Sequence, residues 1–196
     1  MPANLQDESP RERILQTAAD LFYRNGYRAT GTNEIIDKAN VAKATFYAHF
    51  PTKDDLCLAY LKDRNAREAE EIMTFVNSKR SPLTRFYAVM DSMEPWAINT
   101  QYRGCQFINM VPEVPDHTHE LRKEGHRHYD WARNLVHQLA QKLIDSDPKK
   151  YKHLNADDLT ESYMTHLAGA IALAGVYNKL GPIKSGMKAV RRLVSD

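Results

Sequence analysis

Apolar residues recur at helical spacing along nearly the whole chain, and this feature most restricts the possible fold. The alternating runs of β-branched residues that are typical of strands are missing from the sequence. From residue 53 to about residue 79 no proline or glycine interrupts the helical pattern, which predicts one long helix. At 1.5 Å per residue this helix would be roughly 40 Å long. The sequence therefore predicts an all-α fold.

Turn and capping residues divide the chain into helices. Ser9, Pro10 and Glu12 form a capping-box pattern that starts the first helix, and Gly26 is predicted to end it. Further boundaries are predicted at Asn40-Val41, Pro51-Thr52, Ser81-Pro82, Glu94-Pro95, Pro112, Asp116, Asn155 and Gly181-Pro182. We expect an N-terminal domain of three helices at residues 1–52, a connecting helix at 53–79 and a helical bundle at 80–196.

Composition sets wider limits on location and partners. Lys and Arg number 27 against 25 Asp and Glu, so a net charge of +2 neither demands nor excludes a polyanionic partner. Two cysteines far apart in sequence fit a reducing compartment and provide no disulfide framework. The N-terminus lacks a signal-peptide pattern, and no apolar stretch approaches the roughly 20 residues that span a bilayer. We therefore expect a cytoplasmic protein without a membrane partner.

Residues 31–50, GTNEIIDKANVAKATFYAHF, have the arrangement of a helix-turn-helix. Ile35 and Ile36 are predicted to be buried and to anchor the first short helix to the core. Phe46 is predicted to anchor the second short helix in the same way. Asn40 lies where the turn needs a left-handed backbone, which asparagine tolerates better than most residues. The second helix then exposes a face suited to a DNA major groove, formed by Lys43, Ala44, Thr45, Tyr47 and Ala48.

The positive surface of this N-terminal segment is predicted to be narrow. Acidic side chains match the basic ones over residues 1–60, so the segment is not basic overall. The residues left to form a positive footprint are Arg28, Lys43 and Lys53. Because phosphate contacts supply most non-specific affinity, we expect that affinity to be modest.

The stretch GYRATGTNEIIDKANVAKATFYAHFPTKDDL resembles the signature of the tetracycline-repressor (TetR) family of bacterial regulators, over the first sixty or so residues. Asn40, Ala42 and Ala44 stand where the family usually has Gly, Ser and Gly, and Ala42 gives up a capping hydroxyl. The resemblance implies a transcriptional regulator, usually a repressor, that binds a double-stranded DNA operator. By position it implies DNA contacts from Thr30, Thr32, Asn33, Lys43, Thr45, Tyr47, His49 and Lys53, with the first three and Lys53 directed at the DNA backbone.

Beyond about residue 80 the resemblance extends only to architecture, and it implies a helical bundle around an effector site. Ligand sites are mostly apolar with a few directional polar groups, so aromatic, methionine and inward polar residues are the candidates. These are Phe86, Met90, Met93, Trp96, Cys105, Phe107, Ile108, His128, Trp131, Ala132, Tyr163 and His166. The pattern favours a largely apolar or aromatic small molecule, although each residue on its own also suits a plain core.

The segment from residue 156 to about 180 is apolar on almost all sides, so it must be covered on two sides. One cover is the chain's own core, and the other is predicted to be a second subunit in a two-fold homodimer. The small residues that permit close approach, and the apolar residues of the last helix, give the candidate interface Ala168, Gly169, Ala172, Gly175, Val190 and Val194. A monomer in which this helix is central is the alternative.

Other functions receive less support from the sequence. The histidines His117, His119, His126 and His128 invite a metal site, but only His128 lies on an apolar stripe, so we predict no metal and no cofactor. The motifs of di-iron bundles, zinc proteases, phosphate-binding loops and nucleophile elbows are missing, so an enzyme is not expected. A helical bundle that binds a protein partner and has lost DNA binding is the remaining alternative.

Overall fold

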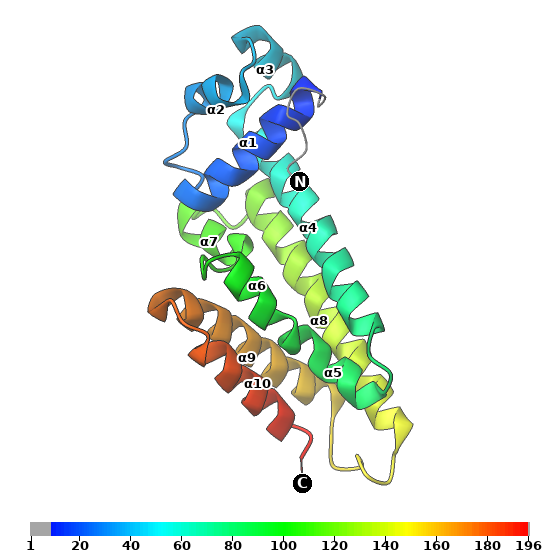
Figure 1. Cartoon of the computed structure of the whole chain (residues 1–196). Coiled ribbons are helices and arrows are strands. Elements are labelled where there is room, and N and C mark those ends of the chain that lie inside the picture. Colours follow the sequence, from blue (N-terminus) through cyan, green and yellow to red (C-terminus); the bar gives the residue numbers. More distant parts are fainter. Residues whose placement is uncertain (1–8, 196) are drawn as a thin grey trace. The chain divides into compact units, whose positions relative to one another are not determined.

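Capped α-helices account for most of the chain in the computed structural model, which describes residues 9–195 (Figure 1). Ten helices and no strand lie within these residues, which confirms the all-α prediction. The expected domain at residues 1–52 begins with residues 1–8, which lie outside the described part. The helices are α1 Pro10–Asn25, α2 Thr32–Ala39, α3 Lys43–His49, α4 Lys53–Asn77, α5 Pro82–Asp91, α6 Met93–Asn99, α7 Gln106–Glu113, α8 Glu120–Ser146, α9 Ala156–Tyr177 and α10 Gly181–Arg192.

Several predicted helix starts are confirmed by side-chain caps. Ser9 and Glu12 form the capping box of α1, with each side chain bonded to the other residue's backbone N–H. Ser81 caps α5 in the same way with Thr84. The side chain of Asn155 accepts two backbone N–H groups at the start of α9. These caps satisfy donors that a helix N-terminus otherwise leaves unpaired.

Three predicted boundaries are wrong. Pro112 does not end a helix but lies inside α7, which continues to Glu113. Pro95 does not end a helix but lies in the first turn of α6, where a proline removes no intrahelical hydrogen bond. Asp116 does not cap α8, which begins only at Glu120. Its carboxylate instead accepts the backbone N–H and the hydroxyl of Thr118, which forms a turn ahead of the helix.

The chain forms two compact units, each made of two separate segments. Unit 1 consists of residues 1–66 and 106–126, of which residues 9–66 and 106–126 are described, and unit 2 consists of residues 67–105 and 127–196. Helices α4 and α8 contribute residues to both units. None of the described helices is long and apolar enough to cross a membrane.

Unit 2 is organised by α5, α9 and α10, and α9 and α10 lie side by side (Figure 1). The fully buried Tyr163 of α9 packs edge-on against Phe86 of α5, and its hydroxyl accepts the Met90 backbone N–H at 2.7 Å. Gly186 of α10 permits this close packing, because a Cβ there would collide with the end of Met90. An ion pair from Arg191 to Asp91, at 2.8 and 2.9 Å, joins α10 to α5.

Candidate functional site

The turn between α2 and α3 fixes how the two helices meet. Asn40 adopts the left-handed conformation, with φ 51° and ψ 56°, as predicted. Its backbone N–H bonds the carbonyls at the end of α2, and Val41 then leads into α3. Ile35 on α2 and Phe46 on α3 are fully buried. Buried anchors on one side of each short helix therefore set the orientation of α3.

The opposite side of α3 is open to solvent. Tyr47 is 40% exposed, and its ring packs edge-on against Phe46 at 5.1 Å between centroids. Thr45 is half-buried beside it. We define the α3 face as the exposed residues Lys43, Ala44, Tyr47 and His49. This face combines a cation, two ring side chains and a small residue, so it offers both phosphate and base-edge contacts.

The turn before α2, residues 26–31, corrects one predicted contact. Thr30 is 0% exposed, and its hydroxyl donates to the backbone carbonyls of Gly26, at 2.8 Å, and Leu21. Its side chain therefore stabilises the α1–α2 turn and does not face a phosphate. Thr32 and Asn33, at the start of α2, remain accessible, with Thr32 half-buried and Asn33 exposed.

Lys53, at the start of α4, also braces this turn. Its ammonium donates to the carbonyls of Tyr27, at 3.1 Å, and Thr30, at 3.3 Å, and lies 4.3 Å from the centre of the Tyr27 ring. Tyr27 in turn donates its hydroxyl to Asp54. Burial, and then the bond to Asp54, raise the pKa of the Tyr27 phenol, so it stays protonated as the donor. An ammonium has three donors, so a phosphate contact from Lys53 stays a prediction.

The charges around the site agree with a narrow positive footprint. Arg24 pairs with Asp20 at 2.6 Å within α1, and Lys38 pairs with Glu34 at 2.9 Å within α2. Both pairs are exposed, so they contribute little stability, but they offset two positive charges locally. Arg28 and Lys43 are exposed at the surface of the same unit.

The predicted effector residues are divided between the two units. Phe107 and Ile108 belong to unit 1, and the other candidates belong to unit 2. Phe86, Met90 and Tyr163 are fully buried against one another, so they form core packing. The buried candidates that remain in unit 2 are Met93, Cys105, His128 and Ala132, and the half-buried ones are Trp96, Trp131 and His166.

Two polar groups that the sequence analysis missed lie next to these candidates in unit 2. Glu68 of α4 is buried, and its carboxylate lies 3.8 Å from Nε2 of the buried His128. The second group is Tyr129, which forms a side-chain hydrogen bond with Cys105. The pKa of the Tyr129 phenol is raised mainly by burial and secondly by Cys105. The available signal was a charged residue on an apolar stripe, because Glu68 follows Leu61 at a seven-residue interval.

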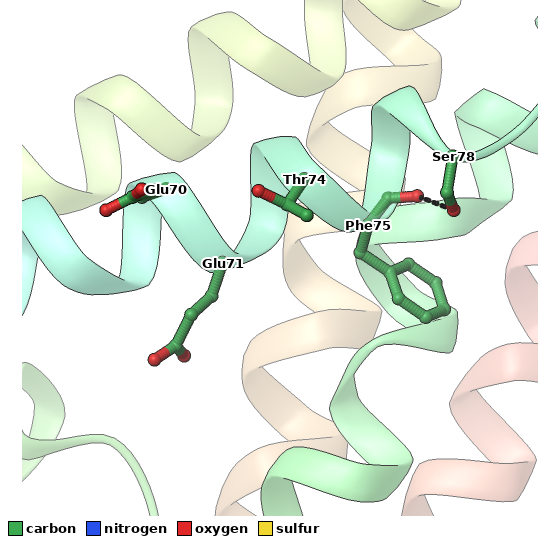
Figure 2. A pocket seen from close by; sticks show the side chains of 5 residues that line it. All are labelled: Glu70, Glu71, Thr74, Phe75 and Ser78. Carbon is green, nitrogen blue, oxygen red and sulfur yellow. Dashed lines mark hydrogen bonds between the residues drawn. The ribbon is translucent and has the colours of Figure 1, made fainter.

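A shallow hollow of about 460 Å³ lies on α4 and is lined by none of the predicted effector residues. Figure 2 shows its side chains, with Ser78 donating to the Phe75 carbonyl at 2.6 Å. The lining is Glu70, Glu71, Thr74, Phe75 and Ser78. Because all of these residues come from one helix and the residue after it, the hollow is a surface depression without opposing walls. It does not resemble an enclosed effector cavity.

The predicted dimer residues divide into two groups. Gly169, Ala172 and Gly175 are exposed on α9 and Ala168 is half-buried, whereas Val190 and Val194 are buried within the chain's own unit. The two valines are therefore corrected to core residues. Three large apolar side chains on α9 that were not predicted from the sequence, Leu173, Val176 and Tyr177, are also exposed, and Val176 is 74% exposed. We define the α9 face as Gly169, Ala172, Leu173, Gly175, Val176 and Tyr177.

The four histidines considered as metal ligands have different surroundings. His119 bonds Asp54 at 3.0 Å in unit 1, and His128 faces Glu68 in unit 2. His117 and His126 are exposed. Within residues 9–195 no group of three His, Cys, Asp or Glu side chains is arranged to hold a metal ion.

A buried anchor beneath an exposed second helix, after a left-handed turn, defines a helix-turn-helix DNA-binding unit. Residues 14–60 match the profile of the bacterial regulatory proteins, tetR family. This segment is therefore a TetR-type DNA-binding domain, and the chain as a whole is similar to TetR-family transcriptional regulators.

Relatives and solved structures that are named as transcriptional regulators support this similarity. The HTH-type transcriptional regulator QacR of Staphylococcus aureus is 27% identical, over 67% of this chain and 78% of its own. An uncharacterized HTH-type transcriptional regulator in the lacX 3' region of Lactococcus lactis subsp. lactis is 29% identical, and the match spans 58% of this chain and only 59% of that relative. SCO4454, a TetR-family transcriptional regulator from Streptomyces coelicolor, superposes with a TM-score of 0.82 at 27% identity, covering 94% of this chain and 88% of its own. These relatives are regulators, in agreement with the expectation that the chain is not an enzyme.

Proposed function

We propose that this chain is a one-component transcriptional repressor that binds a palindromic operator as a homodimer and is released by a small, largely apolar effector. The α3 face carries the DNA-binding part of the proposal. Phe46 fixes the helix from inside, and Lys43, Tyr47 and His49 are presented outward. Side chains of this kind on an exposed second helix suit the base edges and phosphates of a major groove.

The α9 face supports the homodimer. Large apolar side chains stand next to exposed glycines and alanine on one helix, so a flat apolar surface is accessible to another helix. A second copy of the same face is a natural cover, because most soluble homo-oligomers close with two-fold symmetry.

The effector part rests on unit 2. Trp96, Trp131 and His166 are half-buried, and Glu68 and His128 provide buried polar groups among apolar neighbours. Such a mixture fits a largely apolar molecule with one or two polar atoms. Helix α4 is continuous and shared by both units, so we assign the transmission of the signal to it. The effector must bind the two states of the protein unequally, and effector and DNA then oppose each other reciprocally.

The test is a selection of short duplexes of randomised sequence by the purified protein, followed by gel-shift titration of the selected duplex. We expect a near-palindrome whose half-sites lie about one helical turn, roughly 34 Å, or slightly more apart. A protein that binds every duplex equally weakly would support the alternative, a helical bundle for a protein partner.

A further inference from the structure

The α1–α2 turn, residues 26–31, sets where the DNA-binding helices begin. Gly26 ends α1 with φ at +93°, a conformation that favours glycine, and five residues later Gly31 leads into α2. Thr30 closes the turn from inside with its two backbone bonds. Any shift of this turn would therefore move Thr32 and Asn33, the accessible residues at the start of α2.

A carboxylate from a distant part of the sequence holds this turn. Glu113, the last residue of α7, accepts the backbone N–H of Arg28 at 2.6 Å, across 85 positions of sequence. The same carboxylate lies against Gly26 so closely that a Cβ at that position would collide with it. Glu113 thus contacts two residues of the turn at once. A hydrogen bond to an ionised acceptor is shorter and stronger than a neutral one.

A second pair of contacts reaches the same turn. Asp54 accepts the hydroxyl of Tyr27 and also faces His119, 3.0 Å away, just before α8. Residues 106–126 therefore reach the α1–α2 turn at Glu113 directly and at His119 through Asp54. All of these contacts lie within unit 1. The segment is continuous with unit 2 at both of its ends, since residues 105 and 127 belong to that unit.

We propose that Glu113 is a positioning residue for DNA binding, whose carboxylate holds the α1–α2 turn in the conformation that presents α2 and α3 to the duplex. This inference rests on the proposed function. It assigns a role in DNA binding to a residue outside the helix-turn-helix, in a segment tethered at both ends to unit 2. Glu113 acts through the backbone of Arg28 and does not itself contact DNA.

The experiment compares Glu113→Ala and Glu113→Gln with the control Glu120→Ala. Glu120 is an exposed carboxylate of the same segment that pairs with Lys123, three residues further on. The probes are the duplex selected by the wild-type protein and a scrambled duplex of the same length. The exchange rate of the Arg28 backbone amide, measured by NMR without DNA, reports on the turn directly.

For Glu113→Ala we expect selected-duplex affinity to fall about tenfold or more. The hydrogen bond to a charged group is lost, so the turn spends less time in the conformation that binds DNA. Scrambled-duplex affinity should fall less, because non-specific binding depends on phosphate contacts and makes no base-edge contacts that need the exact placement of α3. The Arg28 amide should exchange about tenfold faster. Glu113→Gln keeps an oxygen that can accept this N–H, so its duplex affinity and its Arg28 exchange rate should both lie near the wild-type values. Glu120→Ala should match the wild type.

Either of two results would overturn the positioning role alone. One is an unchanged Arg28 exchange rate in Glu113→Ala, which means that the carboxylate does not hold the turn. The other is faster exchange with unchanged affinity for the selected duplex, which reduces the contact to a stabilising one. A wild-type protein that selects no duplex refutes the proposed function instead, and the positioning role with it. If Glu113→Ala does not fold, Glu113→Leu, which keeps the bulk of the side chain and removes both oxygens, supplies the same two readouts.

Discussion

The α3 face and the α9 face rest on the same kind of support but carry opposite chemistry. The buried side of α3 carries the fully buried Phe46, and the buried side of α9 carries the fully buried Tyr163. The α3 face then exposes a lysine, a histidine and a tyrosine, whereas the α9 face exposes Leu173, Val176 and Tyr177 beside glycines. The buried side of each helix therefore fixes its place, and the exposed side selects its partner. A polyanion suits the first face and an apolar surface suits the second.

The largest effect is expected from placing a charge on the α9 face. In Val176→Glu a carboxylate would be buried at the proposed dimer contact, where it has no partner and disfavours association. Because Val176 is 74% exposed in the chain itself, the fold should be retained. We expect a monomer in sedimentation, and a fall in operator affinity of about a hundredfold or more as bivalent binding is lost.

The matched control for that change is Gln138→Glu. Gln138 is exposed on α8 and lies outside both faces, so the same carboxylate there should leave the dimer and the operator affinity unchanged. A Val176→Glu protein that remains dimeric and binds the operator like the wild type would place the interface elsewhere.

The next effect concerns the ring of the α3 face. Tyr47→Ala should weaken operator binding about ten- to hundredfold, the cost of about 1–3 kcal/mol for a residue that contacts base edges. The fold should persist, because alanine favours helix and the ring is already 40% exposed. Circular dichroism measures whether the helical fold persists, and gel-shift titration measures operator affinity. A collapse of the helical signal would instead make Tyr47 a core residue, packed on Phe46.

Tyr47→Phe separates the parts of this side chain. It keeps the edge-on contact with Phe46 and removes only the hydroxyl. Full recovery of operator affinity would assign the contribution to the ring, and no recovery would assign it to the hydroxyl.

Local patterns predicted one half of this comparison better than the other. The helix-turn-helix could be derived because its turn, caps and buried anchors lie within about twenty residues of each other, and Asn40 adopts the predicted left-handed backbone. Thr30 could not be placed in this way. Its assignment came from the resemblance alone, and its hydroxyl is used by the carbonyls of Leu21 and Gly26.

Contacts between distant segments explain the remaining differences. The pattern showed that α9 is apolar on nearly all sides, but only the packing of α9 against α10 shows that Val190 of α10 is buried and Val176 of α9 is exposed. Similarly, no periodicity pairs Glu113 with Arg28, 85 residues earlier. Phe107 and Ile108 were grouped with the effector residues for their apolar character, although their segment belongs to unit 1.

The smallest effect is expected from removing one charge of the α3 face, and it is the most direct test of what that face binds. A protein that neutralises one phosphate releases roughly one counterion, so each lost contact lowers the slope of log affinity against log salt by about 0.9. Lys43→Ala should therefore weaken selected and scrambled duplexes alike, by several-fold at moderate salt, and flatten both salt dependences by about one unit. Lys38→Ala is the control, since Lys38 is also exposed in this unit but is paired with Glu34 at 2.9 Å. Its removal should change the slope much less. Equal slopes for Lys43→Ala and the wild type would mean that the ammonium does not meet a phosphate, and the α3 face would then have to bind DNA through Tyr47 and its neighbours alone.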